Sequence, residues 1–97
     1  MFNVIARIVP KSEHHEAVKA ALLGIIPATL AEPGCRVFTL LEGPEELWLF
    51  EEFDDEAALR FHLEQDYTKA VSSNYPEWLK EPVRAHFPQR ISPLLDL

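Results

Sequence analysis

The sequence predicts an α+β fold with the element order β-α-β-β-α-β, the ferredoxin-like arrangement with a four-stranded antiparallel sheet. The opening segment, residues 2–9, is rich in β-branched residues and ends at Pro10, which lacks the N–H that a central strand needs. Two apolar runs, residues 35–42 and 47–53, flank a turn at 43–46 and predict an antiparallel hairpin. Between the first strand and this hairpin, apolar residues recur at the three- and four-residue steps of a helix, at Val18, Ala21, Leu22, Ile25 and Ile26.

The ends of this first helix are predicted from its flanking residues. Ser12 is placed to cap the helix, and Glu13 and Glu16 lie near its positive end. Pro27 falls inside the helical pattern and predicts a kink or a new turn, because it cannot donate to the carbonyl four residues earlier. The helix is expected to be over by Glu32-Pro33-Gly34.

The second half of the chain predicts a split second helix and a last strand. Asp54 or Asp55 is expected to cap a helix that ends at Leu63. The inner side of this helix is predicted to carry Ala58, Leu59, Phe61 and His62. A short helix, a turn with Pro76 at its first helical position and a last strand follow at residues 67–73, 74–80 and 83–87.

Both faces of the strand at 47–53 are mostly apolar, although its side chains alternate between the faces. A small antiparallel sheet usually keeps one face in water. We therefore expect helices to cover one face and a second copy of the chain to cover the other. Trp48 and Phe50 are assigned to this homodimer interface, where aromatic residues are enriched. The mostly apolar tail at 91–97 is expected to pack across it.

Length and composition predict one domain over residues 1–97, which is 47% hydrophobic but has no run of ~20 apolar residues that could span a membrane. The N-terminus lacks the features of a secretory signal, so a cytoplasmic location is expected. The net charge of −7 disfavours nucleic acids and anionic membrane surfaces as partners. A single cysteine, Cys35, has no partner for a disulfide or a metal, and the adjacent histidines His14 and His15 point about 100° apart on a helix.

Four segments in order resemble the antibiotic biosynthesis monooxygenase family, also described as quinol-monooxygenase-type proteins of the dimeric α+β barrel superfamily. They are the strand VIARI at 4–8, the helix end AEPGCRVF at 31–38, the step Glu51-Glu52-Phe53, and the helix DDEAALRFHL at 54–63. The resemblance runs from Val4 to about Phe87 and rests on the order and spacing of these segments. It implies a homodimer in which two four-stranded sheets meet as a barrel, with a pocket between sheet and helices in each subunit.

The resemblance also implies a cofactor-independent monooxygenase that oxidises a small aromatic, quinol or polyketide-like substrate with O2 and needs no metal or flavin. The chemistry has a simple physical basis. An electron-rich ring that has lost a proton can itself pass an electron to oxygen, so the protein needs only to bind the substrate, take its proton and exclude water. A dry pocket with one base is sufficient.

His62 and Tyr67 are the predicted catalytic residues. His62 stands at the position of the family's helix histidine, and an ordinary imidazole with a pKa of ~6.5 can exchange a proton at neutral pH. The alternative is a histidine that only fills the helix–sheet interface. Tyr67 stands where many members of the family have a second histidine. A phenol with a pKa of ~10 is a poor base, so Tyr67 is expected to donate a hydrogen bond to a substrate oxygen.

The predicted substrate-binding residues are Leu49, Glu51, Phe53 and Phe61. Phe53 stands where the family usually has Trp, so it keeps a stacking face and loses the indole donor. Glu51 is expected either to orient His62 or to form an ion pair with Arg7 or Arg36, because a carboxylate in a covered layer needs a partner or a raised pKa.

Three other functions fit the same pattern. A small-metabolite isomerase needs the same single base, and a non-catalytic or stress-related dimer that binds an apolar ligand needs none. The changes from Trp to Phe53 and from His to Tyr67 favour such a binding module. A haem-degrading relative is less favoured. Those members of the family have an Asn on the first strand, a Trp where Phe53 stands and a haem-ligating His later in the helical segment, a region that holds Val71, Ser72 and Ser73 in this chain.

Overall fold

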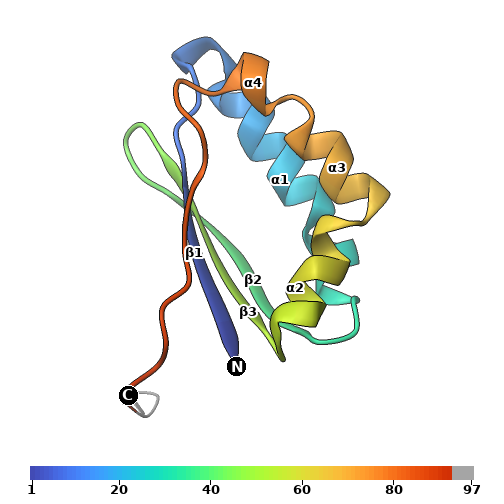
Figure 1. The fold of residues 1–97 in the computed structure, drawn as a ribbon. Coiled ribbons are helices and arrows are strands. Elements are labelled where there is room, and N and C mark those ends of the chain that lie inside the picture. Colours follow the sequence, from blue (N-terminus) through green and yellow to red (C-terminus); the bar gives the residue numbers. More distant parts are fainter. Residues whose placement is uncertain (93–97) are drawn as a thin grey trace.

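The computed structural model describes residues 1–92, so positions 93–97 of the predicted tail lie outside the described residues. The strands and helices follow the predicted order β-α-β-β-α-β, and the second helical region is split (Figure 1). The elements are β1 (Phe2–Ile8), the 3-10 turn η1 (Ser12–His14), α1 (His15–Leu30), β2 (Cys35–Glu42), β3 (Leu47–Phe53), α2 (Glu56–Leu63), α3 (Asp66–Ser72), α4 (Tyr75–Trp78) and β4 (Arg84–His86). The predicted ferredoxin-like α+β fold is confirmed.

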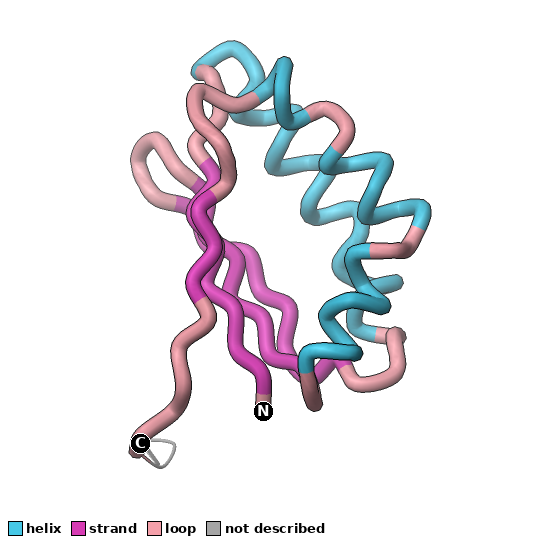
Figure 2. The backbone as a smooth tube through the Cα atoms, viewed as in Figure 1, coloured by secondary structure: helices cyan, strands magenta, loops and turns pink. Residues whose placement is uncertain are grey.

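The four strands form one antiparallel sheet in the order β2-β3-β1-β4. Figure 2 shows the helices together on one side of this sheet. In the register, Glu51 of the central strand β3 lies between Val4 of β1 and Phe38 of β2, and all three are buried. The side of the sheet that faces the helices therefore presents one carboxyl group among apolar side chains.

The N-terminus of α1 differs from the prediction. Ser12 lies in the 3-10 turn, where its hydroxyl contacts the Glu13 carboxylate at 3.4 Å, and it does not cap α1. The helix begins three residues later, at His15, because this tight turn separates it from β1. At its other end α1 continues past Pro27 to Leu30. The first turn of a helix lacks intrahelical partners for its N–H groups, and no side chain caps them here.

Helix α2 begins as predicted, because the Asp55 carboxylate accepts the backbone N–H of Ala58 at 2.9 Å. Its inner side is placed only partly as predicted. His62 is buried, whereas Phe61 is 42% exposed. Neighbouring residues on a helix point about 100° apart, so the phase that turns His62 toward the core turns Phe61 toward the outside.

The turn at Gly34 connects α1 to β2 and packs against the start of α2. Gly34 has a φ of +84°, a conformation that residues with a side chain rarely adopt, and a Cβ at this position would lie 2.8 Å from the Ala58 Cβ. Its carbonyl accepts the Asp54 N–H at 2.8 Å. This close approach brings the segment just after α1, which contains Glu32, against α2.

The second face of the sheet carries Ile5, Arg7, Trp48 and Phe50, as their register requires. The Arg7 guanidinium lies 5.8 Å from the centre of the Trp48 ring. The chain's own C-terminal segment crosses one end of this face, where the Asn3 amide donates to the Pro88 carbonyl at 3.3 Å. The assignment of Trp48 and Phe50 to the side away from the helices is confirmed, and their role in a dimer stays a prediction.

Among residues 1–92, no helix combines the length and the hydrophobicity needed to cross a bilayer.

Candidate functional site

A cavity of about 200 Å³ lies between the sheet and the helices. Most of its wall is aliphatic, because the inward residues of β1, α1 and β3 meet there. The polar groups in its lining are few and come from four different elements. They are Glu51 of β3, His62 of α2, Thr68 and Ser72 of α3, and Tyr75 of α4. The arrangement suits an apolar molecule that carries a small number of polar atoms.

His62 is held by a buried carboxylate that follows α1. Its Nδ1 lies 2.9 Å from Oε2 of Glu32, and both side chains are almost fully buried. The Thr68 hydroxyl lies 3.5 Å from the same ring nitrogen. With Glu32 as the acceptor, Nδ1 carries the proton, and Nε2 is then the nitrogen with a free lone pair. Among residues 1–92, Nε2 has no hydrogen-bond partner, so it is available to a molecule in the cavity.

Tyr67 binds Glu32 and does not line the cavity. Its hydroxyl donates to Oε2, the carboxylate oxygen that also contacts His62. Burial, the hydrogen bond to Glu32 and the negative charge of that carboxyl raise the pKa of Tyr67 to about 12, so its hydroxyl keeps the proton that it donates. The other Glu32 oxygen, Oε1, is buried and has no donor from residues 1–92.

Two phenyl rings fix the plane of the His62 ring. The ring of Phe38 lies 5.2 Å from it and that of Phe53 lies 5.8 Å from it, centre to centre. Phe53 is completely buried, packs against His62 and is absent from the cavity lining. Phe61 is also absent from the lining, for the reason of helical phase given above. Of the predicted substrate-binding residues, Leu49 and Glu51 line the cavity.

Glu51 lies in the cavity wall without a protein partner. It is 5% exposed, and within the described part of the chain its carboxyl makes no hydrogen bond or ion pair. The two arginines proposed as partners are engaged elsewhere: Arg7 with Glu81 at 2.9 Å and Arg36 with Asp54 at 2.6 Å. Burial, with the charge of Glu32 as a smaller cause, raises the pKa of Glu51 from 4.5 to about 7. This pKa places Glu51 near the point of protonation at neutral pH.

Sequence reasoning missed the carboxylate that holds His62. Glu32 reads as part of a helix-ending Glu-Pro-Gly segment, and its partner lies 30 positions further along the chain. The only available signal was its charge at the end of a strongly apolar helix. Tyr75 of α4 also lines the cavity. Burial, and then the charge of Glu51, raises the pKa of the Tyr75 hydroxyl to about 12.

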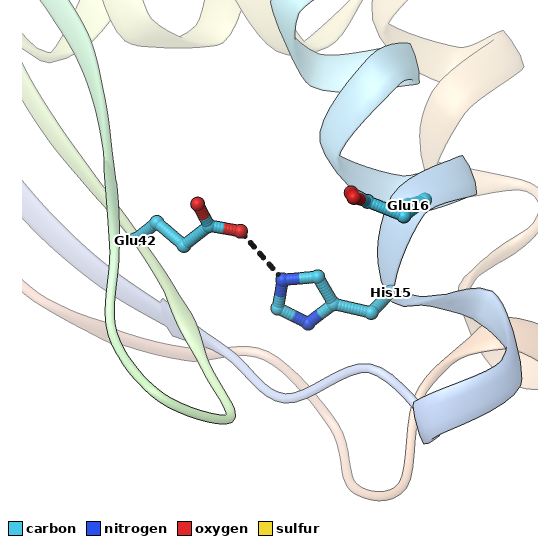
Figure 3. A group of neighbouring side chains, drawn as sticks. All are labelled: His15, Glu16 and Glu42. Carbon is cyan, nitrogen blue, oxygen red and sulfur yellow. Dashed lines mark hydrogen bonds and ion pairs between the residues drawn. The ribbon is translucent and has the colours of Figure 1, made fainter.

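A surface cluster of His15, Glu16 and Glu42 has the spacing of a metal site (Figure 3). The His15 Nε2 lies 2.8 Å from the Glu42 carboxylate. The Lys19 ammonium, however, lies 3.0 Å from Glu16 and 3.1 Å from Glu42, so a cation already bridges the two carboxylates. The neighbouring His14 stacks on Trp78. These contacts describe an exposed ion-pair network that ties α1 to the end of β2.

The single cysteine lies close to the site. Cys35 is partly buried, and burial together with the charges of Glu32 and Glu51 raises the pKa of its thiol to about 11. Because the thiolate is the reactive form, this thiol is a weak nucleophile at neutral pH. Cys35 packs against the hydrophobic core as a small, partly buried residue.

The fold and the cavity define a ferredoxin-like α+β protein with a small apolar site, whose wall includes a histidine that a buried glutamate holds. The profile of the antibiotic biosynthesis monooxygenase family matches residues 1–73. The chain belongs to the antibiotic biosynthesis monooxygenase family, as the four sequence segments predicted.

Relatives support this assignment over most of the chain. The Mycobacterium tuberculosis protein named "Putative monooxygenase Rv0793" is 35% identical over 82 residues, which are 82% of this chain and 81% of that protein. The solved structure of Rv0793 matches with a TM-score of 0.89 at 31% identity, over 95% of this chain and 96% of the other. PA3566 from Pseudomonas aeruginosa has the same fold, with a TM-score of 0.87 at 23% identity over 94% of each chain.

Proposed function

We propose that this protein is a cofactor-independent monooxygenase that oxidises a small hydroxylated aromatic or quinol-like substrate with O2. The observation that carries the proposal is His62 in the wall of an apolar cavity, held through Nδ1 by the buried carboxylate of Glu32. Membership of the monooxygenase family and the name of the mycobacterial relative point to the same chemistry. The fold alone would not choose this activity among the many that it supports.

In this proposal His62 acts as the base. Its Nε2 takes the proton of a ring hydroxyl, while Glu32 holds the proton on Nδ1 and stabilises the positive charge that forms on the ring. The resulting phenolate passes one electron to O2, and the two radicals combine at a ring carbon. His62 returns the proton to this peroxide, and loss of water, which takes up the hydrogen on the same ring carbon, leaves one oxygen atom on the ring and releases the other. The apolar wall excludes bulk water, which would quench the charged intermediates.

The size of the cavity restricts the substrate. A cavity of ~150 Å³ accommodates benzene, so about 200 Å³ suits one aromatic ring or two fused rings. Larger ligands usually occupy pockets of roughly 300–1,000 Å³. The volume therefore favours small quinols and naphthols over multi-ring polyketides or a haem macrocycle.

Oxygen consumption tests the activity. Metal-stripped protein is incubated with a panel of benzene diols and naphthols, alongside His62→Ala and His86→Ala. His86 lies exposed on β4, so it is a matched control for the loss of a histidine away from the cavity. We expect uptake with at least one compound, a loss of ~10²-fold or more in His62→Ala, and little change in His86→Ala. Equal rates in the two variants would contradict the role of His62, and no uptake with any compound would favour an isomerase or a binding module.

We also propose a homodimer formed through the sheet face that carries Trp48 and Phe50. In a single chain part of this face is open, and Leu41 on it is 54% exposed. Leu41→Arg should shift the protein from dimer to monomer in sedimentation equilibrium. Leu23 on α1 is 51% exposed, and Leu23→Arg is therefore the matched control that should leave the dimer intact. A monomeric wild-type protein would contradict the proposal.

A further inference from the structure

Glu51 is the most unusual group in the cavity that the proposed reaction does not use. It projects from the central strand of the sheet, opposite the helices that supply His62 and Tyr75. A buried carboxyl group normally has a hydrogen-bonded partner, because burial without one is unfavourable. Glu51 has none among residues 1–92, although two arginines lie on neighbouring strands. The Glu51 carboxyl is therefore free to form a hydrogen bond with a molecule in the cavity.

We propose that Glu51 binds the substrate as a neutral carboxylic acid, donating a hydrogen bond to a carbonyl or quinone-type oxygen on the ring. This proposal rests on the function proposed above and narrows its substrate class. The substrate then carries two oxygens with different roles: a hydroxyl that gives its proton to His62, and an acceptor oxygen that Glu51 holds. Hydroxylated aryl ketones and hydroxyquinones have this pattern, whereas a simple phenol lacks the acceptor.

The surroundings of Glu51 favour the neutral form. Apolar residues flank it on the sheet, with Val4 on one side and Phe38 on the other. The titratable groups near it are Glu32 beyond the helix end, Cys35 of β2, His62 of α2 and Tyr75 of α4. Glu32 repels a second negative charge, the Cys35 thiol and the Tyr75 hydroxyl stay protonated, and Glu32 already engages His62. Glu51 therefore has no nearby cation left to hold it ionised.

The chemistry of a neutral acid differs from that of a carboxylate at this position. A protonated carboxyl is both a donor and an acceptor, whereas the ionised form only accepts and repels a carbonyl oxygen. The pKa of Glu51, raised to about 7 by burial and by Glu32, means that the donor is present below neutral pH and lost above it. Binding of an acceptor oxygen should therefore weaken as the pH rises through this value.

The test measures binding without turnover. The probes are 1-indanone, which has a ring carbonyl, and indane, which has the same two fused rings without the oxygen. Dissociation constants are measured by NMR titration at about pH 5.5 and about pH 8.5. We expect 1-indanone to bind roughly tenfold more weakly at the higher pH, a factor that corresponds to the net contribution of about one hydrogen bond. Indane should bind with the same affinity at both pH values.

Two variants separate Glu51 from other titrating groups. Glu51→Gln keeps a donor that does not ionise, so 1-indanone should bind with little pH dependence and near its affinity at low pH. Glu51→Leu removes the donor, so 1-indanone and indane should bind alike. A pH dependence that persists in Glu51→Gln would place the titration on another group, such as His62, and would overturn the proposal. Failure of both probes to bind the folded wild-type protein would overturn it as well.

A second measurement needs no ligand. In protein with ¹³C-labelled glutamate carboxyls, one resonance should titrate with a midpoint near pH 7 and be absent from Glu51→Gln. If every glutamate of the protein titrates near ordinary values, Glu51 is ionised at neutral pH and the proposal is wrong. Neither probe carries a ring hydroxyl, so these results do not depend on whether His62 supports oxidation, and failure of the oxygen-consumption test would leave them unchanged.

Discussion

Two buried carboxyl groups, Glu32 and Glu51, lie on opposite sides of the same histidine-containing site, and their surroundings differ. Glu32 is 7% exposed and accepts hydrogen bonds from His62 and Tyr67, whereas Glu51 is 5% exposed and has no donor among residues 1–92. Burial alone therefore does not decide what a carboxyl group does. The donors around Glu32 make it an acceptor that orients the His62 ring, whereas burial and the charge of Glu32 raise the pKa of Glu51 to about 7.

The largest expected effect is on Glu32. Removal of one member of a buried pair leaves the other polar group unpaired, which typically costs about 3–5 kcal/mol. We expect Glu32→Ala to lower the free energy of unfolding by about that amount in urea titrations. Glu16→Ala is the control, because its exposed pair with Lys19 contributes less than about 1 kcal/mol. Similar small losses in both variants would show that Glu32 and His62 do not stabilise each other.

Substitution of Glu51 should raise the free energy of unfolding instead of lowering it, and this effect should depend on pH. Its pKa is higher in the folded protein, about 7, than its ordinary value of 4.5. The folded state therefore binds the proton more tightly, so this contribution to stability is complete below pH 4.5 and is lost as the pH rises through about 7. Glu51→Gln removes the group that must ionise.

The measurement is the difference in unfolding free energy between Glu51→Gln and the wild type at about pH 5 and about pH 8. From the lower to the higher pH, the free energy of unfolding of the variant should rise relative to that of the wild type by up to roughly 3 kcal/mol. This is the free-energy equivalent of the pKa shift. Glu46→Gln in the surface turn is the control and should show no such change. A constant difference between Glu51→Gln and the wild type would mean that the Glu51 pKa is ordinary.

The sequence predicted the fold much better than it predicted this pair of carboxyls. Strand periodicity, the hairpin turn and the Asp55 cap are local signals, and β2, β3 and α2 have the predicted bounds. The assignment of His62 to the interior was also local, because it followed from helical phase. The same phase was misjudged for Phe61, since an apolar residue next to an inward position can equally face outward.

Glu32 could not be found in this way because its role depends on tertiary contacts. A glutamate before Pro-Gly is an ordinary helix end in sequence, and its hydrogen bonds to His62 and Tyr67 join positions far apart in the chain. Glu51 was identified as a carboxylate in a covered layer that needs a partner or a raised pKa. The expectation of an arginine partner was wrong, because Arg7 lies on the opposite face of the sheet and pairs with Glu81, and Arg36 pairs with Asp54. Which groups compete for a partner is decided by the folded arrangement.

Substitution in the turn at Gly34 has the smallest expected effect. It should perturb Glu32 without perturbing Glu51, because this turn positions Glu32 but not Glu51. Glu51 is fixed by the central strand, whereas Glu32 lies on the short segment between α1 and Gly34. Gly34→Ala forces a side chain into a left-handed conformation and into contact with Ala58, which should cost about 2 kcal/mol. Gly24→Ala, in a helix with nothing within 4 Å of the new Cβ, should instead stabilise by about 0.5–1 kcal/mol.

The spectroscopic consequence separates the two carboxyls. In Gly34→Ala the ¹⁵N chemical shifts of the His62 ring should change, because Glu32 moves relative to Nδ1. The titration midpoint of Glu51 should move little, because burial in the sheet is its main cause and the charge of Glu32 is the smaller one. A large shift in the Glu51 midpoint with an unchanged His62 ring would reverse the assignment, and would mean that Glu32 controls the protonation of Glu51 more strongly than it positions the histidine.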